Sequence, residues 1–168
     1  MRMSKMKRQS FGFTLLEVLV AVVIVSLGML GVAALLVTVH KANTSSYIQQ
    51  QAVQTAYDML DRMRANLQGA QAGYYSKTYT PPFSPPGTSC VGTGNTCTAQ
   101  QLANFDTSQW ASTDLTVLPQ GSANVTSAVS TNGNVSVTVT VNWSDAPAQA
   151  AIEKTGSSAR ALTLTTVL

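Results

Sequence analysis

The feature that most constrains this chain is a long apolar stretch near the N-terminus that carries one acidic side chain. A basic leader is followed by Gly12-Phe13-Thr14-Leu15-Leu16-Glu17 and then by 22 residues without charge, Val18–Val39. A helix needs about 20 apolar residues to cross the hydrocarbon core of a bilayer. The stretch therefore predicts a membrane-spanning helix with an acidic residue near its start.

Glu17 is the only charged residue between Phe13 and Val39. A carboxylate costs roughly 2.5–3.5 kcal/mol at the centre of a membrane helix and less near its ends. An acidic residue inside a membrane segment is therefore a functional hypothesis, and it needs a named partner. The alternative is a side chain that extends to the lipid headgroups and has no further role.

The basic leader predicts the topology of the chain. It holds four of the ten basic residues, and basic residues beside a first apolar segment stay cytoplasmic. Without residues 1–12, six basic side chains remain against seven acidic ones, so the net charge of +3 becomes −1. An ordinary signal peptide has a shorter apolar core of about 7–15 residues. A plain single-pass anchor accounts for the apolar run but not for the Gly12-Phe13 junction or for Glu17.

A single long helix is predicted from Phe13 to about Leu67, because this span contains no proline. Its first part is apolar on all sides, and Gly28 and Gly31 there allow either close helix packing or local unwinding. Its second part is amphipathic. The apolar residues recur at spacings of three and four, namely Ala52, Val53, Ala56, Leu60, Met63 and Leu67. The polar residues lie opposite, namely Gln50, Gln51, Gln54, Asp58, Asp61 and Arg62.

The rest of the chain predicts an antiparallel sheet. Gly69 and Gly73 are expected to end the helix, Tyr74–Gly94 to be irregular, and Gln100–Asn104 to form a short helical turn. Asn132-Gly133 is a hairpin dipeptide, and Pro147–Ala151 is expected to be a loop. The predicted strands are Asp114–Leu118, Ala123–Val129, Val135–Trp143 and Ala159–Leu168. The fold class is therefore α+β, with the long N-terminal helix packed on a C-terminal sheet.

Cys90 and Cys97 are the only cysteines, and both lie in the part of the chain that the leader predicts to be exported. In an oxidising compartment two cysteines indicate one disulfide, with free thiols or a metal as alternatives. The only histidine, His40, fits the membrane edge better than a catalytic role. Arg62 and Arg64 fit a solvated face or ion pairs, and Trp110 and Trp143 fit a core. No catalytic set, metal site or cofactor site is indicated.

The junction Gly12-Phe13-Thr14-Leu15-Leu16-Glu17, with its apolar helix, resembles the type IV prepilin signature of the pilin and pseudopilin superfamily. The resemblance implies that a membrane prepilin peptidase cuts between Gly12 and Phe13 and methylates the new amine of Phe13. Glu17 then becomes the fifth residue of the mature chain and docks subunits by pairing with that amine. The chain lacks the helix-breaking proline of major pilins, with Ala34 near that place. Unwinding would therefore rest on Gly28 and Gly31.

Further segments are similar to the minor pilins called type IV pilus modification protein PilV. They are Glu17–Ala21, Leu27–Gly31, Ala56–Asn66, the cysteine pair, Leu118–Gly121 and Val139–Asp145. The resemblance implies a non-catalytic subunit that primes pilus assembly with other minor and major pilins and the inner-membrane assembly machinery. The subunit would sit in inner-membrane lipid, with its head in the periplasm, and then enter the extracellular filament, or fimbrium.

The resemblance divides the chain into a cleaved leader (residues 1–12), a transmembrane and filament-core helix (13–40) and a head. The head combines an amphipathic helix (41–67) with a β-sheet part (68–168) that contains the Cys90–Cys97 loop. Two alternatives use the same N-terminus, namely a type II secretion pseudopilin and a tip adhesin or DNA-binding minor pilin. From Tyr74 onward the head has three basic residues against four acidic ones. It therefore lacks the basic stripe that nucleic-acid binding needs.

Overall fold

A computed structural model describes residues 12–87, 89–92, 94, 96–145 and 158–168. The leader before Gly12 and the expected loop Pro147–Ala151 lie outside the described residues. The chain divides into two compact units, Met1–His40 and Lys41–Leu168. We call them the N-terminal unit and the head.

Helix α1 runs from Leu15 to Ala65 and contributes to both units. In the N-terminal unit its large apolar side chains are exposed, with Ile24 at 64% and Leu30 at 68%. Among the described residues, α1 is the one helix long and apolar enough to cross a membrane, and its most apolar 18-residue window has a mean hydropathy of 2.8. Such a surface needs lipid or other apolar helices around it.

Within the head, one face of α1 is buried. The buried residues recur at helical spacing and are Ile48, Ala52, Thr55, Ala56, Met59, Leu60 and Met63. Four of the six residues predicted for the apolar face are among them, namely Ala52, Ala56, Leu60 and Met63. The other two predicted residues are not buried. Val53 is half-buried, and Leu67 is exposed because it lies beyond the end of α1.

The end of α1 differs from the expectation, because the helix stops at Ala65 rather than at Gly69. Asn66 caps a second helix, α2 (Leu67–Gln71), by accepting a hydrogen bond from the Gly69 backbone N–H at 3.2 Å. A side chain at Gly69 would collide with the Asn66 amide, so this glycine allows close approach and does not end a helix. Gly73 follows α2 with φ +76°, a conformation that favours glycine.

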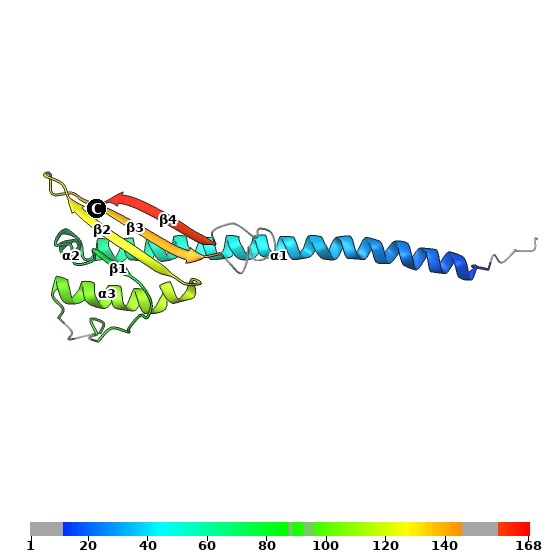
Figure 1. The fold of residues 1–168 in the computed structure, drawn as a ribbon. Helices are drawn as coiled ribbons and strands as arrows, with labels where there is room; N and C mark the ends of the chain where they lie inside the picture. The colour runs from blue at the N-terminus through cyan, green and yellow to red at the C-terminus, as the bar shows by residue number, and fades with distance from the viewer. Residues whose placement is uncertain (1–11, 88, 93, 95, 146–157) are drawn as a thin grey trace, which may run out of the picture. The chain divides into compact units, whose positions relative to one another are not determined.

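The head contains a four-stranded antiparallel sheet with the order β1-β2-β3-β4 (Figure 1). Three of the predicted strands are confirmed, and Asn132-Gly133 forms the turn between two of them, with Gly133 at φ +83°. The short strand β1 was not predicted, since it lies in a segment expected to be irregular. The strands are β1 (Lys77–Tyr79), β2 (Ser122–Val129), β3 (Val135–Ser144) and β4 (Ala159–Val167).

Two elements between β1 and β2 also differ from the expectation. The short turn predicted at Gln100–Asn104 is the first part of a 15-residue helix, α3 (Ala99–Thr113). The predicted strand Asp114–Leu118 is wrong, because this segment contains a 3-10 helix, η1 (Leu115–Val117). Leu115 and Leu118 are buried there and the residues between them are exposed, a period of three that a strand does not produce.

The core of the head lies between the sheet and the two helices α1 and α3. Alternate residues of β3 point into it, as predicted, and Val135, Val137, Val139 and Val141 are all fully buried. Trp110 of α3 donates its indole N–H to the Thr55 carbonyl of α1 at 2.9 Å and packs edge-on against Tyr79. Trp143 is buried as well. Both tryptophans are therefore core residues, which joins the long helix and the sheet into an α+β head.

Candidate functional site

The Gly12–Phe13 peptide bond lies just outside the start of α1. Thr14 precedes the helix, and its carbonyl accepts hydrogen bonds from the Glu17 and Val18 N–H groups at 3.1 and 3.3 Å. Phe13 is 84% exposed, and no atom of the described residues lies within 4 Å of the position that a side chain at Gly12 would take. The bond is thus open to an enzyme, and the described part of the fold gives no steric reason for a glycine here.

Thr14 is a functional residue that the sequence reasoning missed. Its hydroxyl accepts a hydrogen bond from the Glu17 backbone N–H at 3.2 Å, which caps α1. The signal was present, since Thr-x-x-Glu is the pattern of a capping box. The cap fixes where the helix begins and leaves Gly12 and Phe13 in front of it.

Glu17 lies in the first turn of α1. Its side chain is exposed, and within the described part of the chain its carboxylate has no hydrogen-bond or ion-pair partner. An acidic group near a helix N-terminus gains about 0.3–1 kcal/mol from the helix dipole. That gain is smaller than the roughly 2.5–3.5 kcal/mol that a carboxylate costs at the centre of a membrane helix.

Gly28 and Gly31 lie three residues apart on one side of α1, and the helix continues through both. Added methyl groups at these two positions would meet nothing within 4 Å. Within the residues that the structure describes, the two glycines therefore have no packing role. They lower the stability of the helix by about 1 kcal/mol each relative to alanine.

A polar cluster joins α1, the turn after α2, and α3. We call it the Arg62 cluster, and its members are Asp58, Arg62, Asn66, Tyr75, Asp106 and Gln109. Arg62 bonds Asp58 at 2.7 Å and Gln109 at 2.9 Å, and lies 3.7 Å from Asp106. The Tyr75 hydroxyl donates to Asp106 at 2.6 Å and accepts from Asn66 at 3.0 Å. Arg62 thus makes ion pairs within the head, whereas Arg64 pairs with Asp61 on the exposed surface.

Burial raises the pKa values of Asp106 and Tyr75 in this cluster and of Tyr79, which bonds the Tyr75 carbonyl. Desolvation raises the pKa of the Asp106 carboxyl above its usual value, although the Tyr75 hydroxyl and Arg62 oppose that rise. Desolvation also raises the pKa of Tyr75, and it raises the pKa of Tyr79 to about 12. Among the described residues, no three His, Cys, Asp or Glu side chains lie close enough together to hold a metal ion. The contacts of Arg62 with Gln109 and Asp106 join α1 to α3.

Asp106→Asn tests this electrostatic balance. A raised carboxyl pKa means that the folded state holds a proton more tightly than the unfolded state, so ionisation of Asp106 lowers stability as the pH rises through its titration. An amide keeps an acceptor for Tyr75 but removes the charge. We expect the melting temperature of Asp106→Asn, relative to wild type, to rise as the pH is increased from 4 to 7. Asp61→Asn, which changes only an exposed pair, is the control. If the difference in melting temperature between Asp106→Asn and wild type does not change with pH, the raised pKa of Asp106 is contradicted.

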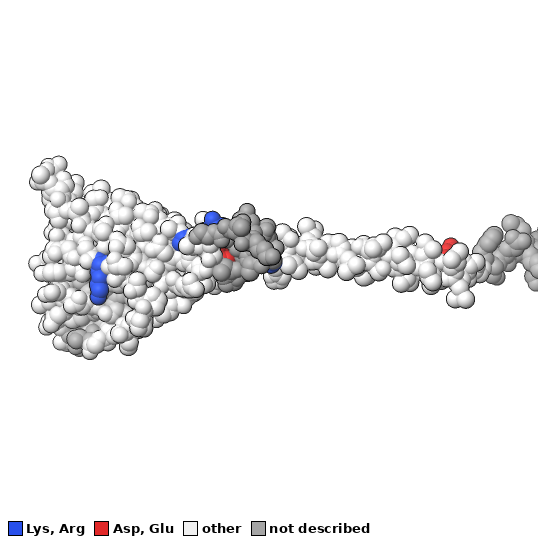
Figure 2. All heavy atoms as spheres, in the orientation of Figure 1, with Lys and Arg blue, Asp and Glu red and all other residues white. Residues whose placement is uncertain are grey.

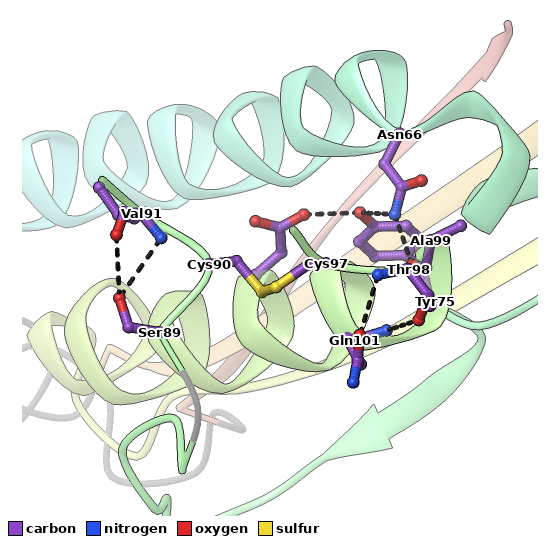
Figure 3. The surroundings of a disulfide bond; sticks show 10 residues. Asn66, Tyr75, Ser89, Cys90, Val91, Cys97, Thr98, Ala99 and Gln101 are labelled. Atoms are coloured by element: carbon purple, nitrogen blue, oxygen red, sulfur yellow. Dashed lines mark hydrogen bonds between the residues drawn. A yellow bond between two sulfur atoms is a disulfide. The ribbon is translucent and has the colours of Figure 1, made fainter. Parts of the chain in front are cut away.

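The Cys90–Cys97 disulfide is present, with the two Cα atoms 5.8 Å apart. It closes a loop directly before α3 (Figure 3). Thr98, the residue after Cys97, caps α3 by accepting from the Gln101 N–H at 3.2 Å, and Gln101 accepts from the Thr98 N–H at 2.9 Å. Asn66 donates to the next carbonyl, that of Ala99, at 2.8 Å. The disulfide thus fixes the loop at the point where α3 begins. At the same point α3 contacts Asn66, the residue that follows α1.

Replacing both Cys90 and Cys97 by Ser should destabilise the head by about 2.5 kcal/mol, the chain-entropy value for a loop of this length. We expect the melting temperature to fall by roughly 5–10 °C. Thermal unfolding followed by circular dichroism measures the shift. Ser89→Ala, which removes an exposed hydroxyl that bonds Val91 in the loop but keeps the disulfide, is the control. An unchanged melting temperature would show that the disulfide does not hold this region.

The surface of the head is weakly charged. Figure 2 shows one face, on which Lys, Arg, Asp and Glu atoms are few and scattered. The exposed positions on the outer side of the sheet are mainly threonine, serine and asparagine, such as Thr126, Thr163 and Asn124. No basic stripe is visible on the described surface of this face, in line with the charge count of the sequence.

The structure thus defines a class of protein in which one exposed apolar helix carries an α+β head. Residues 34–108 match the family model described as type IV pilin Tt1218, and residues 7–33 match the prokaryotic N-terminal methylation motif. The two matches support a type IV pilin, a member of a structural and non-enzymatic family. The second match covers the whole Gly12–Glu17 junction. No curated protein and no solved structure matches the chain.

As a type IV pilin with the methylation motif, the chain is a membrane-anchored subunit that is processed by prepilin peptidase and assembled with other pilins. This confirms the resemblance to the pilin superfamily and the predicted fold class.

Proposed function

We propose that this chain is a minor pilin, a non-catalytic subunit that takes part in priming and assembling a type IV pilus. The observation that carries the proposal is the match of residues 7–33 to the methylation motif. The match spans Gly12, Phe13 and Glu17, and it supports assigning processing to the exposed Gly12–Phe13 bond. The similarity of the sequence to PilV minor pilins supports the role of a minor pilin.

In this proposal prepilin peptidase cuts after Gly12 and methylates the amine of Phe13. Removal of the leader takes away four basic side chains and creates one new cation at Phe13. That amine lies in the same membrane layer as Glu17, four residues further along the chain. The Glu17 carboxylate of one subunit then pairs with the Phe13 amine of a neighbour and sets how far each subunit enters the filament.

The proposed topology follows from the same processing site. The leader stays in the cytoplasm, α1 crosses the inner membrane in contact with lipid, and the head lies in the periplasm until the subunit enters the pilus. The proposed partners are prepilin peptidase, other minor and major pilins and the inner-membrane assembly machinery. Gly28 and Gly31 would let α1 bend or unwind locally during the transfer from lipid to filament.

Cross-linking of the full-length chain in its membrane tests the proposal. A photo-reactive residue in place of Gln50, which is exposed on α1 in the head, would be activated before detergent extraction. We expect adducts with minor pilins of a type IV pilus system. Adducts with components of a type II secretion system would instead identify a pseudopilin. Salt-sensitive binding of DNA by the purified chain would favour the DNA-binding alternative.

A further inference from the structure

The head contains a small cavity beside the edge strand β1. The chain after β1 runs back along α3 (Figure 1), and the cavity lies between β1, residues 82–84 of this segment and one side of α3. Its volume is about 300 Å³, and all of its lining residues belong to the described part of the chain. Small-molecule sites have volumes from about 300 Å³ upward. The cavity is therefore large enough for one small molecule.

Lys77 gives the cavity a positive charge, and among the described residues that line the cavity it is the one charged residue. Lys77 lies on the core side of β1, because it pairs with the buried Val125 of β2. Its ammonium lies 6.0 Å from the centre of the Tyr79 ring, where a cation and an aromatic ring attract each other. No salt bridge of the described residues includes Lys77, so its charge is available to attract an anion.

Hydroxyl groups make up much of the remaining lining. The hydroxyls of Thr80, Ser84 and Ser108 make no hydrogen bond with the described residues, so each can donate to and accept from a ligand. Ser108 is half-buried on α3. Phe83, also half-buried, packs against the core of the head and adds an apolar surface to the lining. The cavity therefore suits a molecule with several hydroxyls, one negative charge and an apolar side.

We propose that this cavity binds an acidic sugar, that is, a monosaccharide unit that carries one carboxylate. Lys77 pairs with the carboxylate, the free hydroxyls bond the sugar hydroxyls, and Phe83 covers the C–H groups of the ring. Phosphate groups are bound by arginine forks or by several N–H groups at a helix N-terminus. A single lysine is a point charge and matches one carboxylate better. The inference goes beyond the proposed function, because binding of a sugar does not depend on pilus assembly.

Titration of the full-length chain with methyl glucuronide tests the proposal. The chain would be held in micelles of a zwitterionic detergent without a sugar headgroup, and binding followed by saturation-transfer NMR. We expect saturable binding that weakens as salt is added. Methyl glucoside has the same ring without the carboxylate, and acetate has the carboxylate without the ring. Each should bind at least about tenfold more weakly. No saturable binding of the glucuronide, or equally tight binding of either control molecule, would overturn the proposal.

Two lysine variants test the role of the charge. Lys77→Met keeps the apolar stem of the side chain but removes the ammonium, and it should weaken binding of the glucuronide by about tenfold or more. Lys41→Met makes the same change at a lysine of α1 that does not line the cavity, and it should bind as wild type does. Melting temperatures confirm that both variants fold. Equal affinities of the two variants would contradict binding at this cavity.

Two serine variants of α3 test the role of the hydroxyls. Ser108→Ala removes one hydroxyl of the lining and should weaken binding of the glucuronide by about three- to tenfold, the effect of one hydrogen bond. Ser112 lies one turn further along α3, is also half-buried and donates its hydroxyl to the Gln109 carbonyl outside the cavity. Ser112→Ala should therefore bind as wild type does. Wild-type affinity of Ser108→Ala, or an equal loss in both variants, would overturn recognition of a sugar.

Discussion

A Glu17→Ala chain is expected to be processed and inserted into the membrane normally but to enter pili at least about tenfold less than wild type. Opposite charges 4 Å apart attract by about 4 kcal/mol at an effective dielectric constant near 20, before the cost of desolvation is subtracted. Loss of even 1.4 kcal/mol of that attraction reduces an equilibrium constant about tenfold. Quantitative immunoblots of sheared pili and of membranes measure how much of the chain has entered pili and how much remains in the membrane.

Two further variants separate the charge of Glu17 from its place in the helix. Glu17→Gln keeps the size of the side chain but removes the negative charge, so it should enter pili as poorly as Glu17→Ala does. Thr14→Ala removes the cap of α1, at a cost of about 0.5–2 kcal/mol, and keeps the charge. It should enter pili more efficiently than either Glu17 variant. Normal entry of Glu17→Ala would show that the carboxylate has no docking role.

Gly12→Ala should abolish cleavage and leave the longer, unmethylated chain in the membrane. The structure makes this test specific, because a methyl group at Gly12 meets no atom within 4 Å and Gly12 lies outside α1. Any effect therefore reports how the peptidase recognises the junction and not a change in the fold. The shift in size is visible on a gel and by mass spectrometry.

Gly28→Ala is the matched control for Gly12→Ala. It makes the same chemical change at a glycine that is also open on all sides, but within the apolar part of α1. We expect it to be cleaved as wild type is, and to make the helix about 1 kcal/mol more stable locally. Complete processing of Gly12→Ala would refute the assigned cleavage position.

The parts of the fold that the sequence predicts well are those with a strong hydrophobic period. The valines of β3 alternate with polar residues, and a hairpin dipeptide, Asn132-Gly133, precedes the strand. Together they predict the antiparallel pairing of β2 with β3 that the structure has. The absence of proline up to Leu67 predicts a long helix, and α1 ends two residues earlier because Asn66 caps α2. The end of α1 depends on contacts of Asn66 with Tyr75 and Ala99, which no local pattern contains.

Helix α3 was predicted too short because its buried face is not strongly apolar. Its buried residues include Asp106 and Thr107 beside Ala103, Trp110 and Ala111, so the hydrophobic period is weak. The capping box of Thr98 and Gln101 was the clearer signal. The segment predicted as a strand, Asp114–Leu118, contains the β-branched residues Thr116 and Val117, but the Asp114 N–H bonds to the Trp110 carbonyl and continues the helical path. Tertiary packing therefore outweighed local propensity.

The candidate site was largely visible in the sequence, because an acidic residue in an apolar run and a glycine before it need no tertiary information. Gly12, Phe13 and Glu17 lie together at the start of α1, and Cys90 and Cys97 are bonded as expected. The sequence indicated only part of the Arg62 cluster. The ion pair of Arg62 with Asp58 follows from helical spacing. Asp106 and Tyr75 lie outside α1, and only the fold brings them near Arg62.

The most direct test of this account is the intact mass of the wild-type chain extracted from the membrane and from pili. We expect a chain that begins at Phe13, carries one methyl group on its amine and contains the Cys90–Cys97 disulfide. The same form is expected in both the membrane and the pili. A chain that retains residues 1–12, or one cut at another position in either pool, would contradict the central claim that the Gly12–Phe13 junction makes this protein a pilin subunit.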